Sequence, residues 1–136
     1  MSDPTYATFT TALSGLTIAG VTRKLTEPPR QVSTADLPLQ FVRLPTGEES
    51  ARTRDHPGGW ITITCDLVVV LEPVQQGTQP VNYAATLAMM DAVSAALRAT
   101  DLAQSRNRWT MRGDWIYLGG ETVYWAVVAS VSNNHL

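Results

Sequence analysis

Apolar and polar side chains alternate most regularly between residues 60 and 72. A period of two is the pattern of a β-strand that buries one face. The apolar face of this predicted strand consists of Ile61, Ile63, Cys65, Leu67, Val69 and Leu71. Val68 and Val70 interrupt the opposite, polar face, so we expect that face to be covered too towards the end of the strand. At about 3.3 Å per residue the run is about 40 Å long, and one end is expected to project beyond the sheet.

Two further strands are predicted earlier in the chain. Residues 16–25 are β-prone, but their apolar positions change face at Gly20, which indicates a bulge or bend. Alternation over residues 37–44 predicts the next strand, and Pro38 places its beginning at a sheet edge because proline has no backbone donor. Residues 45–59 carry charges of both signs and almost no apolar side chain. We expect them to form an exposed loop, or a loop that a partner orders.

Two helices of unequal length are predicted. The short one follows Asp3, which can cap the free amides, with Pro4 at the first helical position, and it ends near Gly15. The long one covers residues 81–99. The residues expected to lie on the sheet are Tyr83, Leu87, Met90, Val93 or Ser94, and Leu97. Alanines surround this stripe, so we expect the helix to be buried on two sides, with another subunit as the second cover.

The last third of the chain is predicted to form a β-hairpin. A three-residue loop at positions 119–121 sets Trp115 opposite Trp125 and lets both apolar faces meet the same core. The same register sets Tyr117 opposite Val123. Residues 132–136 are expected to fray. The predicted fold is therefore α+β: a mainly antiparallel sheet of about five strands, one long helix on a face, a short N-terminal helix and a C-terminal hairpin.

Composition narrows the class of protein. The 136 residues suit a single domain, residues 1–136, and 44% of them are hydrophobic. A net charge of -2 argues against a protein that coats nucleic acid by charge alone. One cysteine cannot form an internal disulfide or a cysteine-based metal cluster, and no apolar run reaches the ~18 residues of a membrane span. With no export signal visible at the N-terminus, we expect a soluble cytosolic domain.

Few residues offer catalytic chemistry. Asp55 and His56 are the only acid and histidine next to each other, but they fall in the predicted loop, and His135 falls in the predicted tail. A hydrolytic site needs a nucleophile, a base and an orienting acid that converge in a pocket. We therefore expect no catalytic residue, no metal site and no cofactor, and we interpret Cys65 as an inert core thiol.

Arginines form the remaining cluster of interest: Arg52, Arg54, Arg106, Arg108 and Arg112. They either form surface salt bridges with nearby acidic residues or contact a partner, and arginine suits paired contacts at interfaces. We favour the interface because the loop has no core of its own. The residues predicted to contact a subunit or partner are Arg52, Arg54, His56, Ala85, Met89, Ala92 and Ala96.

Taken whole, the chain resembles the tail terminator proteins of long-tailed bacteriophages. The resemblance lies in the order, the length and the residue composition of four segments. These are the helix SDPTYATFTTAL, the strand-loop-strand LPLQFVRLPTGEESARTRDHPGGWITITCDLVVV, the alanine-rich helix VNYAATLAMMDAVSAAL and the hairpin WTMRGDWIYLGGETVYWAVVASV.

The resemblance implies a structural protein and not an enzyme. Six copies are expected to form a ring at the head-proximal end of the tail, which caps the tail tube, stops its polymerisation and contacts the head-neck connector. Such a ring belongs to the virion, assembles in the host cytoplasm and lets DNA pass through its lumen without specific binding. It needs heterologous contacts, for which we expect the alanines and Met89 to face outward from the long helix. We expect residues 46–56 to reach along the ring or towards the tube.

Two alternatives stay open. Another neck component, such as a head-closure or tail-completion protein, shares the size and the assembly logic. A small α+β hydrolase or ligand-binding domain built around Asp55 and His56 belongs to a different class, and a stable monomer with a ligand pocket would favour it.

Overall fold

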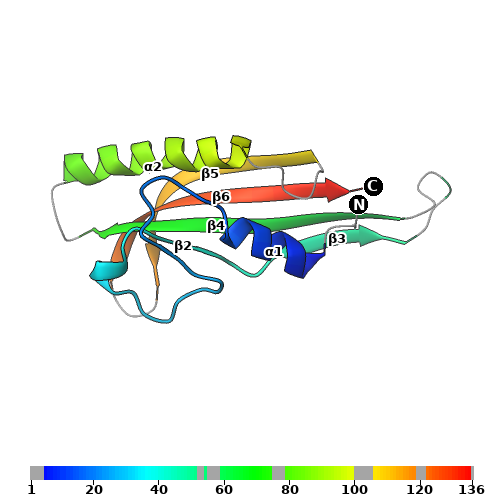
Figure 1. The fold of residues 1–136 in the computed structure, drawn as a ribbon, viewed down its shortest axis with the longest axis horizontal. Helices are drawn as coiled ribbons and strands as arrows, with labels where there is room; N and C mark the ends of the chain where they lie inside the picture. The colour runs from blue at the N-terminus through cyan, green and yellow to red at the C-terminus, as the bar shows by residue number, and fades with distance from the viewer. Residues whose placement is uncertain are drawn as a thin grey trace.

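The computed structural model describes residues 5–51, 54, 59–74, 79–99, 106–118 and 122–135. They form an α+β fold with a six-stranded, mostly antiparallel sheet, which confirms the predicted fold class. The strands are β1 (Arg23–Lys24), β2 (Leu39–Val42), β3 (Thr46–Ser50), β4 (Trp60–Pro73), β5 (Arg106–Tyr117) and β6 (Val123–His135). Their order across the sheet is β1-β2-β4-β6-β5, and β3 pairs with β4 beyond the end of β2. Figure 1 shows the three long strands side by side along the longest axis of the molecule.

Both α-helices pack on the same face of this sheet. Phe9 and Leu13 of α1 (Tyr6–Ser14) and Val93 of α2 (Gln79–Ala99) lie in one core with the odd-numbered residues of β4 and β6. In Figure 1, α2 runs along β5 and β6, and α1 lies beside β2 and β3. The alternation along β4 therefore buries the predicted apolar face, with Ile63, Leu67 and Val69 fully inaccessible.

The other sheet face has a second, smaller core at one end. Val68 and Val70 of β4 pack there with Leu39, Phe41, Ile116, Tyr124, Ala126 and Val128. Leu25, Val32 and Leu37, from the segment that leads into β2, cover this cluster. The two valines on the polar face thus predicted correctly that this end of β4 is covered on both sides.

The C-terminal hairpin has the predicted register. Trp115 lies opposite Trp125, and Tyr117 lies opposite Val123. The two tryptophan rings meet edge to face, with centroids 5.4 Å apart. Residues 119–121, the predicted loop, lie outside the described part of the chain.

The prediction that residues 132–136 fray is wrong for the residues described. β6 continues to His135, which pairs with Ile61 of β4, while Asn134 pairs with Arg106 of β5. Asn133 is completely buried, and its Nδ2 donates to Oδ1 of Asn107 at 2.7 Å. The polar tail sequence stays in the sheet because it lies between two strands that satisfy its backbone groups.

The predicted loop at residues 45–59 contains a strand. β3 pairs with the projecting end of β4, from Thr46 opposite Thr64 to Ser50 opposite Trp60. Four of its five residues are exposed, so it has no apolar alternation that could have revealed it in the sequence. Gly47 leaves room for Tyr6, whose hydroxyl would lie 2.0 Å from a Cβ at this position.

Only a fragment of the predicted strand at residues 16–25 forms. β1 has two residues, and Gly20 turns the chain with a φ of 90°. Leu16 and Ile18 are still buried in the main core. Nε2 of the buried Gln40 donates to the carbonyls of Ser14 at 3.0 Å and Leu16 at 2.8 Å, which replaces the partners that a strand would supply.

The short helix begins at a capping box made by two threonines. The Thr5 hydroxyl accepts from the Thr8 amide at 3.1 Å, and the Thr8 hydroxyl accepts from the Thr5 amide at 2.8 Å. The predicted cap, Asp3, and Pro4 lie outside the described residues. Gly15 ends the helix as predicted.

The long helix exists as predicted, but its buried stripe is rotated. The buried residues are Asn82, Thr86, Met89, Val93 and Leu97. Tyr83 and Leu87, predicted to lie on the sheet, are 58% and 45% exposed. The helix lies so close to β5 that a Cβ on Gly113 would be 3.1 Å from Cγ2 of Thr86, so small side chains take the positions at the contact.

Candidate functional site

Asp55 and His56, the residues of the alternative hydrolytic site, lie outside the part of the chain that the structure describes. Of the two arginines predicted to contact a partner, Arg52 also lies outside it, and Arg54 is exposed. Within the described residues no group of three or more histidine, cysteine, aspartate or glutamate side chains could hold a metal ion. None of the helices in the described part of the chain is long and apolar enough to span a membrane.

Cys65 lies in the main core, as the alternation of β4 predicted. Burial raises the pKa of its thiol to about 11, and the neighbouring Asp66 carboxylate adds to the effect. The thiol donates to the carbonyl of Arg43 at 3.1 Å. A thiol that stays protonated and buried is a poor nucleophile.

The predicted interface residues on α2 do not share one surface. Ala85 is exposed, whereas Ala92 and Ala96 are half-buried against the main core. The prediction that Met89 faces outward is wrong, because it is 7% exposed and packs against the sheet side of the helix. The rotation of the buried stripe explains the error, since it turns Met89 inward and Tyr83 outward.

An apolar groove lies between the first half of α2 and the end of β5. Its volume is about 400 Å³, and it is lined by Tyr83, Thr86, Leu87, Met90, Gly113, Asp114, Trp115 and Trp125. Trp115 is 49% exposed at its rim. Val81 and Tyr117 are also exposed on the two elements that form the groove. The sequence signal for this groove is the helical stripe with Tyr83, Leu87 and Met90, which the apolar pattern predicts to lie on the sheet.

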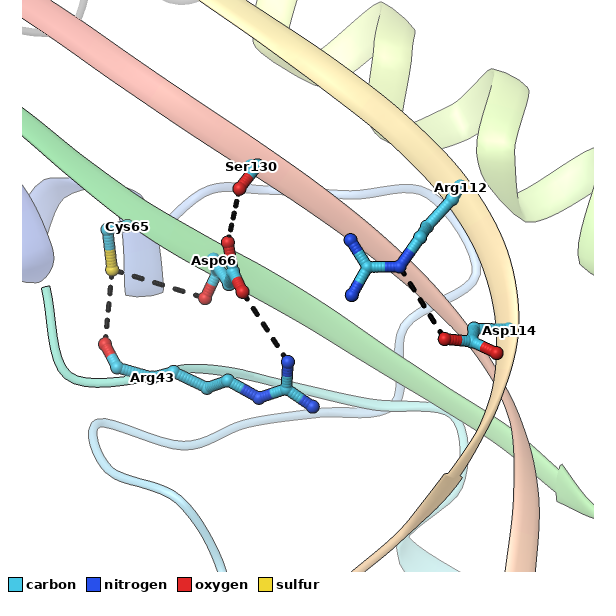
Figure 2. Close-up of polar contacts among 6 residues, drawn as sticks. All are labelled: Arg43, Cys65, Asp66, Arg112, Asp114 and Ser130. Carbon is cyan, nitrogen blue, oxygen red and sulfur yellow. Dashed lines mark hydrogen bonds and ion pairs between the residues drawn. The ribbon is translucent and has the colours of Figure 1, made fainter. Parts of the chain in front are cut away.

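Beyond the second core, the same sheet face carries partly exposed polar side chains around Asp66. As Figure 2 shows, Asp66 accepts a hydrogen bond from Ser130 on one side and meets Arg43 on the other. The Arg43 Nη1 to Asp66 Oδ2 distance is 3.4 Å. Further along, the hydroxyls of Thr64 and Ser132 are 2.9 Å apart. These contacts tie β4 to β6 and to Arg43, the residue that follows β2.

The two edges of the sheet differ in charge. β5 is the last strand on one side and exposes Arg108 and Arg112. Arg112 Nε lies 3.5 Å from Asp114 Oδ2 on the same strand (Figure 2). On the opposite side, β3 exposes Glu48 and Glu49, and Glu49 accepts a hydrogen bond from the Tyr6 hydroxyl at 2.8 Å. The exposed charges are therefore basic on β5 at Arg108 and Arg112 and acidic on β3, whereas β1, on the same side of the sheet as β3, exposes Arg23 and Lys24.

Comparison with protein-family models and with curated proteins found no match to this chain.

Proposed function

We propose that this chain is a structural subunit of a bacteriophage tail, the terminator that forms a ring, expected to be hexameric, at the head-proximal end of the tail tube. The ring stops tube polymerisation, contacts the head-neck connector and lets DNA pass through its lumen without specific binding. It assembles in the host cytoplasm and remains in the virion. The terminator assignment rests on the resemblance of the four sequence segments, and the assembly role rests on the surface described next.

The observation that carries the assembly role is the exposed apolar surface around the groove. Tyr83, Leu87 and Trp115 line it, and each is between 45% and 58% exposed. Large apolar side chains gathered at one place on a small domain are typical of a surface that a partner covers. In this proposal, part of the 44% hydrophobic content is surface that neighbouring subunits cover.

Tube capping in vitro tests this proposal. Purified chain is added to polymerising tail tube protein, and tube lengths are measured by negative-stain electron microscopy. We expect shorter tubes that end in closed rings, and a variant with Tyr83→Ser and Leu87→Ser that folds but caps poorly, because it loses the apolar surface.

The matched control is a variant with Ala84→Ser and Ala88→Ser, which changes exposed residues one position further along the same helix. This control should cap like the unchanged chain. Tubes of unaltered length with the unchanged chain would contradict the terminator role. Equal loss of capping in both variants would contradict the role of the groove.

A further inference from the structure

The two sheet edges suggest how neighbouring copies meet, an inference that rests on the proposed ring. β5 has twelve residues, and β6 is its only sheet neighbour among the described residues. On the opposite side, β3 has β4 as its only described neighbour. An edge strand directs alternate backbone N–H and C=O groups away from its sheet, where they can pair with another strand.

The strand directions permit antiparallel pairing between the two different edges. β4 is antiparallel to β3 and to β6, and β6 is antiparallel to β5. β3 therefore runs opposite to β5. When one copy is rotated next to another to form a ring, β5 of the first meets β3 of the second as an antiparallel pair. Pairing of β5 with β5 of another copy in a register centred on Thr110 would instead set Arg108 opposite Arg112, and like charges repel across a strand pair.

The described strand pairs fix the position of each edge residue along the strand direction. Two edge residues linked through successive pairs lie at the same position, and we call them level. Thr46 is paired with Thr64, Thr64 with Ser132, and Ser132 with Arg108. Thr46 on one edge is therefore level with Arg108 on the other edge. By the same rule Glu48, two residues further along β3, is level with Arg106.

A level alignment of neighbouring copies is blocked by β1. β1 lies outside β2, so it occupies the column that a strand added to β3 would enter. Through Gln40, Val69 and Val127, Lys24 of β1 is level with Gly113 of β5. An incoming β5 in level alignment would place its Gly113 on Lys24. It must therefore shift along the edge, away from β1, until Tyr117, the last residue of β5, no longer reaches the level of Lys24.

A shift of about six residues meets this condition and keeps every side chain on its own sheet face, because the shift is even. It places Arg112 opposite Glu48 and Asp114 opposite Thr46. It also brings Trp115, at the rim of the apolar groove, to the level of Leu44, which is 89% exposed on the segment before β3. The basic and apolar features of one edge thus meet acidic and apolar features of the other.

The same shift suits a closed ring. Four strands, β3, β4, β6 and β5, span about 19 Å from one copy to the next, and six residues rise about 20 Å along a strand. A sheet with this stagger has strands inclined by about 45° to the ring axis, close to the tilt of closed β-barrels. We propose that copies of this chain join by antiparallel pairing of β5 with β3 of the next copy, with Arg112 facing Glu48 and Trp115 beside Leu44.

A disulfide tests this register. A variant with Thr46→Cys and Asp114→Cys should form covalent multimers under mild oxidation, seen as a ladder on non-reducing gels. The two positions of one chain cannot bridge, because three strand spacings of about 4.8 Å alone exceed the Cα distance that a disulfide spans. The native Cys65 is 1% exposed and should not take part.

The matched control carries Thr46→Cys and Arg108→Cys, the pair expected for the level alignment. It should remain monomeric on the gel. An unchanged chain that assembles while the first pair gives no ladder would overturn the edge pairing and leave the proposed ring standing. A ladder from the control pair alone would overturn the shifted register. An unchanged chain that is monomeric at all concentrations would overturn both the ring and this pairing.

Discussion

Individual polar residues hold the irregular parts of this fold in place. Gln40 is the clearest example, because a fully buried glutamine is costly unless its polar atoms have partners. Its Nε2 satisfies two carbonyls where the chain between α1 and β1 does not form a strand. Its Oε1 has no hydrogen-bond partner among the described residues. The side chain is therefore retained for the donors it supplies and not for its acceptor.

Gln40→Met tests this role, because methionine has a similar shape but cannot donate. We expect the free energy of unfolding to fall by about 1–3 kcal/mol, the cost of leaving buried carbonyls without a donor. Denaturant unfolding followed by circular dichroism measures the change. The control, Gln31→Met, alters an exposed glutamine and should change stability little. An unchanged free energy for Gln40→Met would show that these two hydrogen bonds contribute nothing net.

At the scale of elements, the sequence predicted what depends on burial and missed what depends on neighbours. β4 and the hairpin register followed from alternation, because both of their apolar faces meet the core that the pattern describes. β3 and the end of β6 were missed, because their exposed or polar residues are held by backbone pairing with adjacent strands. Such pairing leaves no periodic signal in side chains.

The groove was missed for a related reason. Helical periodicity located α2 correctly, but it could not choose between two overlapping stripes, one with Tyr83 and Leu87 and one with Thr86 and Met89. The more apolar stripe was the natural choice for the core. The structure selects the other, since Gly113 permits close approach only by a small residue such as Thr86.

The contact between α2 and β5 at Gly113 gives a prediction for these elements. Gly113→Ala should destabilise the fold by about 1 kcal/mol, because the new methyl group meets Cγ2 of Thr86. In a Thr86→Ser background the same change should be neutral or stabilising. Serine removes Cγ2 and keeps the hydroxyl that donates to the Asn82 carbonyl. A double-mutant cycle of unfolding free energies measures the coupling, and additive effects would contradict this account of why the helix is rotated.

At the scale of the whole molecule, one face of the sheet carries both helices and the other is half covered by the segment before β2. The features that suit contacts with neighbours lie at the sides: the edge strand β5 with its exposed arginines, the edge strand β3 with its exposed glutamates, and an apolar groove beside β5. A subunit that presents two different but complementary surfaces forms heterologous contacts. Such contacts form a closed ring when the rotation from one subunit to the next divides a full turn evenly. This arrangement supports the proposed ring independently of the resemblance in sequence.

The mass of the purified chain in solution tests the ring most directly. Size-exclusion chromatography with multi-angle light scattering should give a concentration-independent species of about six times the 14.8 kDa of one chain. Another closed number of copies would revise the ring size and keep the heterologous contact. A stable 14.8 kDa monomer across the accessible concentration range would contradict the proposed function.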